Sequence, residues 1–326
     1  MQAIGVDLGF GVTKVASALG RVSFSSAWAP HVAGAEAWGI GMADRPLMMD
    51  GRAVLVGDRA ASGPGARRPF ADGRLADPEA LPLLGAALWR AGVQGDVCLG
   101  SGTPLGMFAR ERETARAALE GRTLTLADGS HETRVRIARL VLRPQGVGAA
   151  LFLAAQGRLP GGAGYVVVLD VGTRTTDVLT LEAGDLSPVM PLCFSLEAGV
   201  ATAAEALAAE AQAATGHLPP ADVSTAALRE PRTWRGRPVG GPAEAAPHLD
   251  ALAAGIRAEV QRRFGAEAGR VAVVALVGGG GVLLRERLAG ALPGECLAVA
   301  DEDAVFSNAE GFRWAAERAA TALGVS

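Results

Sequence analysis

One arrangement of residues occurs twice in this chain and limits the folds that it can adopt. An apolar run ends at Asp7, a glycine-containing turn follows, and a second apolar run begins after the turn. The same order returns in the second half of the chain, where Asp170 and its turn lie between the runs 165–169 and 178–181. Each copy predicts a strand, a turn whose backbone N–H groups can face an anion, and a second strand. Because the arrangement recurs in both halves, we predict two related lobes.

A third segment rich in glycine follows the apolar run 271–277. Gly278, Gly279 and Gly280 precede an amphipathic stretch, which predicts a strand, a close turn and a helix. Without side chains, these positions can approach a flat ligand or another backbone closely. Helices are predicted at residues 110–120, 196–214, 249–264 and 309–323, whereas residues 30–78 and 215–247 are predicted to be loops rich in proline and glycine.

Strands that alternate with helices in both halves predict two α/β domains with mixed sheets. We place the first lobe at residues 1–160 together with a C-terminal helix at 308–326, and the second lobe at 161–307. The chain has 326 residues, and single hydrophobic cores stop growing near ~250–300 residues, so two lobes also suit its length.

Composition excludes several classes of protein. A hydrophobic content of 49% with a net charge of −3 excludes a disordered chain, and that charge gives no basic footprint for direct nucleic-acid binding. No apolar run approaches the ~20 residues of a membrane span, and the N-terminal residues lack the pattern of a signal peptide. Cys98, Cys193 and Cys296 lie far apart, which predicts buried free thiols and a cytoplasmic protein.

The only lysine in the chain lies in the first turn. Lysine and arginine together number 31, and Lys14 is the single ammonium among them. A lysine at this place can act as a compact point charge on a phosphate group. The glycine turn and its lysine therefore predict an anion-binding site near Asp7.

The three glycine segments together resemble a known superfamily. They read DLGFGVTK, DVGTRTTD and VALVGGGG in chain order, and they are similar to the two phosphate motifs and the adenosine motif of the actin, hexokinase and chaperone ATPases. Segments 101–105, 143–149 and 306–312 are similar to those of bacterial and archaeal actin-like proteins of the plasmid-segregation (ParM/StbA) kind. Thr103 departs from the leucine usual in that group. The resemblance spans residues 4–314 and implies an actin-like two-lobed α/β fold with nucleotide between the lobes.

The same resemblance implies roles for particular residues. Asp7 and Asp170 are expected to hold Mg²⁺ through its waters, and Gln145 to orient the water that attacks the γ-phosphate. Both aspartates and Gln145 are thus the expected catalytic residues. The remaining residues expected to contact ATP or ADP are Gly9, Phe10, Gly11, Val12, Thr13, Lys14, Gly172, Thr173, Arg174, Thr175, Gly199, Gly278, Gly279 and Gly280.

The function implied is that of an ATPase that polymerises into filaments of identical subunits. Such filaments serve DNA segregation or intracellular positioning, in some cases through an adaptor protein bound to DNA or other cargo. Two alternatives share the fold: a small-molecule kinase or ATPase activator of another enzyme, and a nucleotide-binding scaffold without turnover. The absence of a cysteine cluster and of a catalytic aspartate in a kinase-like context favours the filament-forming ATPase.

Overall fold

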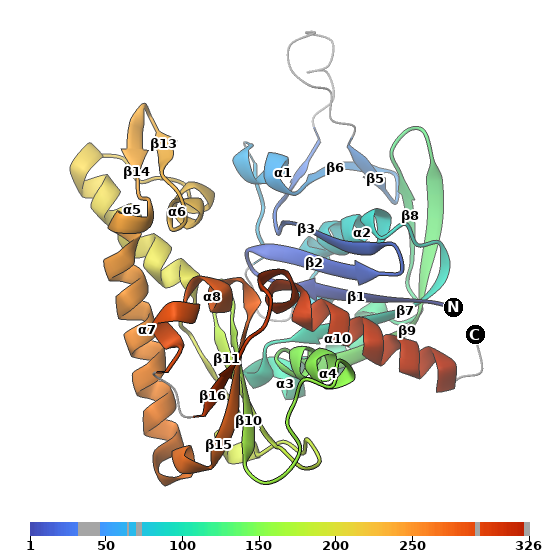
Figure 1. The fold of residues 1–326 in the computed structure, drawn as a ribbon. Coiled ribbons are helices and arrows are strands. Elements are labelled where there is room, and N and C mark those ends of the chain that lie inside the picture. The colour runs from blue at the N-terminus through green and yellow to red at the C-terminus, as the bar shows by residue number, and fades with distance from the viewer. Residues whose placement is uncertain (32–45, 64, 70–73, 291–293, 323–326) are drawn as a thin grey trace. The chain divides into compact units, whose positions relative to one another are not determined.

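The computed structural model describes residues 1–31, 46–63, 65–69, 74–290 and 294–322, which form two compact units (Figure 1). Unit 1 comprises residues 1–103, 107–152 and 308–326, and unit 2 comprises residues 104–106 and 153–307. The chain passes between the units within α4, within α10 and at both ends of the segment 104–106. Among the described helices, none combines the length and the apolar character needed to cross a membrane.

The described residues of unit 1 form a nine-stranded sheet in the order β3-β2-β1-β7-β9-β8-β5-β6-β4. Its strands are β1 (Gln2–Leu8), β2 (Val12–Ser17), β3 (Gly20–Ser25), β4 (Trp28–Pro30), β5 (Leu47–Met49), β6 (Arg52–Val56), β7 (Gly95–Thr103), β8 (Thr123–Ala127) and β9 (Glu132–Pro144). Its helices are α1 (Asp58–Ser62), α2 (Leu81–Arg90), α3 (Phe108–Leu119), α4 (Val147–Ala155) and α10 (Asp301–Ala322), of which α4 and α10 extend into unit 2.

Alternation along β1 assigns the two faces of this sheet. Ile4 and Val6 pack in a core with residues of α2 and α3. Gly5 lies between them in sequence and so faces the other side, where a Cβ on it would lie 1.9 Å from the Ala309 carbonyl oxygen of α10. Phe312 of α10 is fully buried against Gly100 of β7. Helix α10 therefore packs directly on the backbone of β1 and β7.

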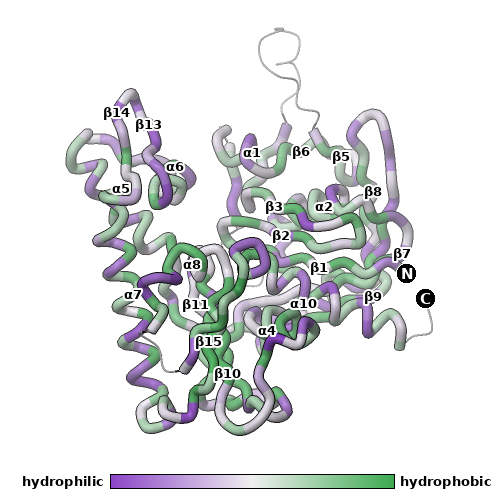
Figure 2. The backbone as a smooth tube through the Cα atoms, viewed as in Figure 1, coloured by the Kyte–Doolittle hydropathy of each residue, from purple (hydrophilic) through white to green (hydrophobic). Residues whose placement is uncertain are grey.

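The described residues of unit 2 form a five-stranded sheet in the order β12-β11-β10-β15-β16. The elements of the unit are β10 (Tyr165–Val171), β11 (Thr176–Glu182), β12 (Phe194–Leu196), α5 (Val200–Thr215), α6 (Ala221–Ala227), β13 (Arg232–Trp234), β14 (Arg237–Val239), α7 (Pro242–Phe264), β15 (Val271–Val277), α8 (Gly278–Leu283), α9 (Arg285–Leu288) and β16 (Glu295–Leu297). Strands β10 and β15 are hydrophobic along most of their length (Figure 2). Alternate residues of β10 pack against α5 and α7 in one core.

The two sheets share one strand plan, which confirms the predicted duplication. In each, an antiparallel three-stranded meander is joined through its first strand to two parallel strands: β3-β2-β1-β7-β9 in unit 1 and β12-β11-β10-β15-β16 in unit 2. The hairpin registers also agree, because Leu8 pairs with Thr13 and Val171 pairs with Thr176. The mixed α/β architecture follows the prediction.

Several predicted boundaries are wrong. Segment 30–78 is not a loop in its described part, because β5 and β6 extend the sheet; residues 32–45, 64 and 70–73 lie outside the described residues. Segment 215–247 holds α6 and the β13–β14 hairpin. Helix α5 starts only at Val200, since residues 194–196 pair with β11, and it ends as predicted at Gly216, whose φ is 75°.

Helix α7 starts at Pro242 and not at 249, and α10 starts at Asp301 and not at 309. Pro247 lies inside α7, where it lacks an N–H donor, and this proline explains why the sequence predicts a later start.

Of the predicted buried thiols only Cys98 is buried; Cys193 and Cys296 are half-buried. Burial nevertheless raises the pKa of all three thiols.

Candidate functional site

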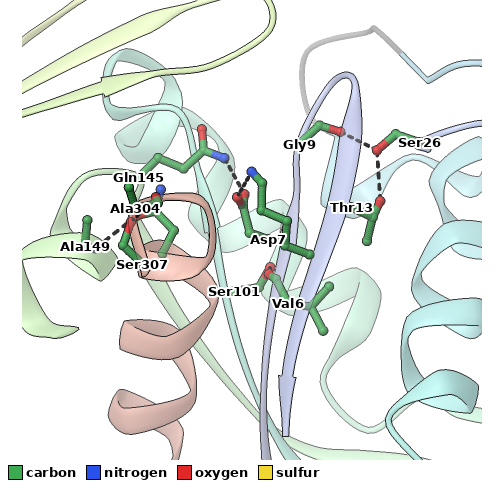
Figure 3. Close-up of polar contacts among 12 residues, drawn as sticks. Val6, Asp7, Gly9, Thr13, Ser26, Ser101, Gln145, Ala149, Ala304 and Ser307 are labelled. Carbon is green, nitrogen blue, oxygen red and sulfur yellow. Dashed lines mark hydrogen bonds and ion pairs between the residues drawn. The ribbon is translucent and has the colours of Figure 1, made fainter. Parts of the chain in front are cut away.

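The unit 1 residues expected to act in catalysis converge on one buried carboxylate. Asp7 lies near the end of β1. The prediction that Lys14 lies in the turn is wrong, because Lys14 is a residue of β2 and the hairpin register places it directly opposite Asp7. The Lys14 ammonium lies 2.9 Å from Asp7 Oδ2, and Gln145 Nε2 donates to Asp7 Oδ1 at 2.8 Å (Figure 3). Asp7 is 2% exposed. The sequence predicted all three residues, and the structure brings them together.

Gln145 follows β9 and is held by contacts on both sides in sequence. Its backbone N–H donates to the Thr103 carbonyl at 2.8 Å. Gly146 then adopts a φ of 82°, and α4 begins at Val147. The buried Asn308 of α10 accepts from the N–H groups of Gly146 and Ala149 at 3.0 and 3.1 Å. Asn308 therefore caps α4 and fixes the turn that carries Gln145.

The first turn, residues 9–11, is packed tightly. A Cβ on Gly9 would lie 2.4 Å from the Val12 carbonyl oxygen, so only glycine fits there without a shift of the backbone. The Phe10 side chain is buried, whereas Val12 is exposed. Only backbone groups of Phe10 can therefore serve a ligand at the surface of this turn.

In unit 2, the start of α5 donates hydrogen bonds to the second turn, residues 172–175. Gly172 N donates to the Thr175 carbonyl at 2.8 Å, which closes the turn. The N–H groups of Val200 and Ala201 donate to the carbonyls of Gly172 and Thr173 at 3.1 and 2.8 Å. Gly199 is required by this contact, since its Cβ would lie 2.4 Å from the Thr173 carbonyl oxygen.

The side chain of Arg174 points to a different partner. Its guanidinium lies 3.5 Å from the Glu197 carboxylate, and both side chains are partly exposed. An exposed pair of this kind contributes little to stability. The expected role of Arg174 in nucleotide binding stays a prediction.

Gly278 and Gly280 are pressed against the Asp170 strand. Gly278 has a φ of 79°, and its Cβ would lie 2.5 Å from Asp170 Oδ1; a Cβ on Gly280 would lie 2.6 Å from Val171 Cγ1. Packing on β10 alone therefore requires both glycines. Gly279 differs, because a Cβ there would meet nothing within 4 Å. Of the three, Gly279 is the glycine whose presence this packing does not explain.

Equivalent positions of the two hairpins carry opposite charges. Lys14 pairs with Asp7 in β2, whereas Asp177 pairs with Asp170 in β11. Asp177 is 2% exposed, and its Oδ1 accepts from the Ser195 hydroxyl and from the Leu105 N–H at 3.3 Å. Like charges directly opposite on neighbouring strands are unfavourable unless a cation or a proton compensates them. Unit 1 thus has an ammonium beside its turn, and unit 2 has a second carboxylate.

The Asp170 carboxylate has the chemistry expected of a Mg²⁺ ligand. Mg²⁺ takes one or two protein carboxylates and keeps waters or phosphate oxygens as its other ligands. Within the described ranges, no group of three or more His, Cys, Asp or Glu side chains is placed to hold a metal alone.

Three residues at these positions were absent from the sequence-based site. Asn308 and Ser26 contact the two turns of unit 1, and Ser101 Oγ donates to the Val6 carbonyl at 2.7 Å beside Asp7. Asn308 lies in the segment 306–312, for which the resemblance implies no role. Ser26 has no local signal, since its partners lie 13 and 17 residues away in sequence.

Comparison with known proteins matches both halves of the chain. A family model described as actin-like proteins, N-terminal domain, matches residues 5–148, and one described as archaeal actin homologue MreB-like, C-terminal, matches residues 168–290. An archaeal actin homologue from Thermoplasma acidophilum is 43% identical over 98% of this chain and 99% of its own length.

Solved structures are similar to this chain over nearly its whole length. The crystal structure of an archaeal actin homologue in complex with ADP is 40% identical, with a TM-score of 0.86 over 98% of this chain and all of that one. A subunit of a 15-stranded ParM filament from Clostridium botulinum has a TM-score of 0.82 at 18% identity, over 98% of this chain and all of that one. The second likeness concerns the fold alone.

Proposed function

This chain belongs to the archaeal actin homologues, and on that premise we propose that it binds ATP with Mg²⁺ and hydrolyses it. The observation that carries this proposal is the convergence of Lys14 and Gln145 on the buried Asp7 beside a glycine turn. The relative solved with ADP supports a nucleotide as the ligand. Residues of both units contribute in this proposal, each through its own turn.

The charges of the two turns define separate roles. Lys14 provides a positive charge for the β- and γ-phosphates, and the N–H groups of both turns add partial positive charges. Asp170 and Asp7 would hold Mg²⁺, which would supply positive charge to balance the charge that develops on the transferred phosphoryl group. Fixed charges of this kind supply most of the catalysis in phosphoryl transfer.

Gln145 orients the attacking water. An amide has two N–H donors and one carbonyl acceptor. Because Nε2 of Gln145 donates to Asp7 Oδ1, the orientation of the amide is fixed, and its Oε1 is the atom that can accept from a water. The water oxygen then bonds to the γ-phosphorus while the bond from that phosphorus to the bridging oxygen breaks. ADP leaves with the bridging oxygen, and a proton of the water passes to another oxygen of the released phosphate.

We further propose that the protein assembles into filaments of identical subunits for DNA segregation or intracellular positioning. Head-to-tail contacts that do not close into a ring generate helical filaments from one chain. The ParM filament, whose subunit has the same fold, supports this proposal. An adaptor protein bound to DNA or to other cargo would then connect the filament to its load.

Calorimetric titration with ATP, with and without Mg²⁺, tests the nucleotide proposal directly. We expect the wild type to bind ATP and to release phosphate only when Mg²⁺ is present. Asp170→Ala should remove the turnover that depends on Mg²⁺. Asp96→Ala is the matched control and should behave as wild type. Asp96 is exposed and lies at the opposite end of β7 from Thr103. A wild type that binds no ATP would refute the proposal.

A further inference from the structure

Ser26 donates two hydrogen bonds to carbonyl groups of the first turn, one from its hydroxyl and one from its backbone N–H. It follows β3 directly and is 2% exposed. Its hydroxyl donates to the Gly9 carbonyl at 2.6 Å, and its backbone N–H donates to the Gly11 carbonyl at 2.9 Å. Figure 3 shows the Ser26 side chain between Gly9 and Thr13. One residue therefore binds two of the three carbonyl groups of the turn.

Proton counting assigns the direction of the remaining contact. Thr13 Oγ1 lies 2.9 Å from Ser26 Oγ, and Thr13 is fully buried. A serine hydroxyl has a single proton, and that of Ser26 is used on Gly9. Thr13 is therefore the donor, and the three groups form a chain from Thr13 through Ser26 to the Gly9 carbonyl. Chains of buried hydrogen bonds polarise and strengthen one another.

The contact determines which backbone groups the turn presents. A carbonyl oxygen carries negative partial charge and would repel a phosphate. A trans peptide group is planar, so the N–H that follows a carbonyl points in the opposite direction, and the described peptide bonds are all trans. When Ser26 holds the carbonyls of Gly9 and Gly11, the N–H groups after them point away from Ser26.

In unit 2, different groups bind the carbonyls of the equivalent turn. There, the N–H groups of Val200 and Ala201 hold the carbonyls of Gly172 and Thr173. Thr176 takes the place of Thr13, is fully buried, and donates to the Ala198 carbonyl at 2.6 Å. In both units, residues that follow the third strand of the meander donate hydrogen bonds to carbonyl groups of the turn. Among the described residues, a side chain binds a carbonyl of the turn in unit 1, whereas backbone N–H groups bind those of the turn in unit 2. A single substitution can therefore remove the contact with Gly9.

We propose that Ser26, supported by Thr13, is a positioning residue that orients the first turn for the phosphates of the nucleotide. The proposal rests on the proposed function, since it assigns the turn to phosphate. Ser26 contacts no substrate in this assignment. It acts only through the carbonyl groups of Gly9 and Gly11.

The test compares Ser26→Ala with Ser25→Ala. Ser25 is the adjacent residue, and its hydroxyl donates to the exposed Asp58 instead of to the turn. We expect Ser26→Ala to raise the Kd for ATP by about 3- to 30-fold, as for the loss of one buried hydrogen bond. Ser25→Ala should match wild type. The Kd for AMP should change less than that for ATP, because AMP lacks the β- and γ-phosphates.

Hydrogen exchange provides a readout that needs no nucleotide. Without ligand, the N–H groups of residues 9–13 should exchange faster in Ser26→Ala than in wild type, while those of the unit 2 turn should not change. Thr13→Val removes the donor to Ser26 and keeps a similar side-chain size. It should cause a smaller effect in the same direction, and it serves as the test if Ser26→Ala does not fold.

The outcomes separate this inference from the proposed function. If wild type binds no ATP, the nucleotide proposal fails, and the exchange rates alone decide whether Ser26 fixes the turn. If wild type binds ATP and Ser26→Ala binds it equally well with unchanged exchange, the inference is overturned. Equal losses for AMP and ATP would also overturn it, because a general loosening of the unit would then explain the data.

Discussion

At the scale of single residues, the Asp7–Lys14 pair links stability to ligand binding. Both groups are largely removed from water, so each depends on the other for compensation of its charge. The same ammonium is the one we assign to phosphate. A substitution at Lys14 therefore affects the free protein as well as the complex, and the two effects need separate measurements.

Lys14→Ala should lower the free energy of unfolding by about 3–5 kcal/mol and weaken ATP binding several-fold or more. The first effect arises because Asp7 keeps a buried charge without its partner ammonium. Adding Asp7→Asn should restore part of the stability, since the unpaired charge is gone, without restoring affinity. Denaturant unfolding and calorimetric titration measure the two quantities. Full affinity in Lys14→Ala would remove Lys14 from the phosphate site.

Gln145→Ala should leave ATP affinity near that of wild type and slow phosphate release by roughly 10- to 10³-fold. The expected loss is that of a group which positions the attacking water without holding the nucleotide. Gln94→Ala, at an exposed position after α2, is the control. A phosphate-release assay that finds equal rates for Gln145→Ala and wild type would reduce Gln145 to a turn residue.

At the scale of elements, α10 supports the site from a distance in sequence. Asn308 binds two N–H groups at the start of α4, and a Cβ on Gly311 would lie 1.7 Å from the Gly148 carbonyl oxygen. The two helices are therefore in backbone contact next to Gln145. This contact gives a physical reason for the asparagine and the glycine of the segment 306–312.

Asn308→Ala should lower the free energy of unfolding by about 1–3 kcal/mol, because two buried N–H groups lose their acceptor. Phosphate release should also slow, since the Gln145 turn is no longer fixed. Asn308→Asp keeps an acceptor oxygen and places negative charge at a helix N-terminus, so it should retain most of the stability. Thermal unfolding of both variants checks this order, and equal stabilities for Asn308→Ala and wild type would contradict it.

Local sequence was sufficient for some elements and insufficient for others. The strands β1, β10 and β15 and their glycine turns were predicted because each is an apolar run that ends at a glycine or an Asp-x-Gly. Strands β5 and β6 were missed, since short strands are specified by their pairing partners more than by their own residues. The roles of Ser26 and Asn308 depend on contacts across many residues of sequence, which no local pattern records.

At the scale of the whole molecule, assembly remains the proposal that depends most on relatives. Linkage requires that if assembly tightens ATP binding, ATP promotes assembly by the same factor. A formal net charge of −3 leaves only weak repulsion between copies. Both considerations are compatible with a nucleotide-dependent polymer.

Micromolar protein should sediment and scatter light with ATP and Mg²⁺ or with a non-hydrolysable analogue, and less so with ADP. The difference is expected because hydrolysis removes the contacts of the γ-phosphate. Pelleting and electron microscopy of wild type, with Lys14→Ala as the variant impaired in binding, measure it. Protein that stays monomeric with every nucleotide, at all salt and protein concentrations, would refute filament formation.

The division of unit 1 along the chain has a consequence for biosynthesis. Residues 153–307 are made between the two main parts of this unit, so the ribosome completes unit 2, with the first residues of α10, before it synthesises the part of α10 that covers β1 and β7. At about 5–20 residues per second, this interval lasts about 8–30 s. During that time the glycine-lined face of the sheet lacks its helix and α4 lacks the Asn308 cap. A nascent chain therefore acquires a fixed Gln145 turn only after Asn308 has been synthesised, and chaperones that protect exposed sheet surfaces can act before then.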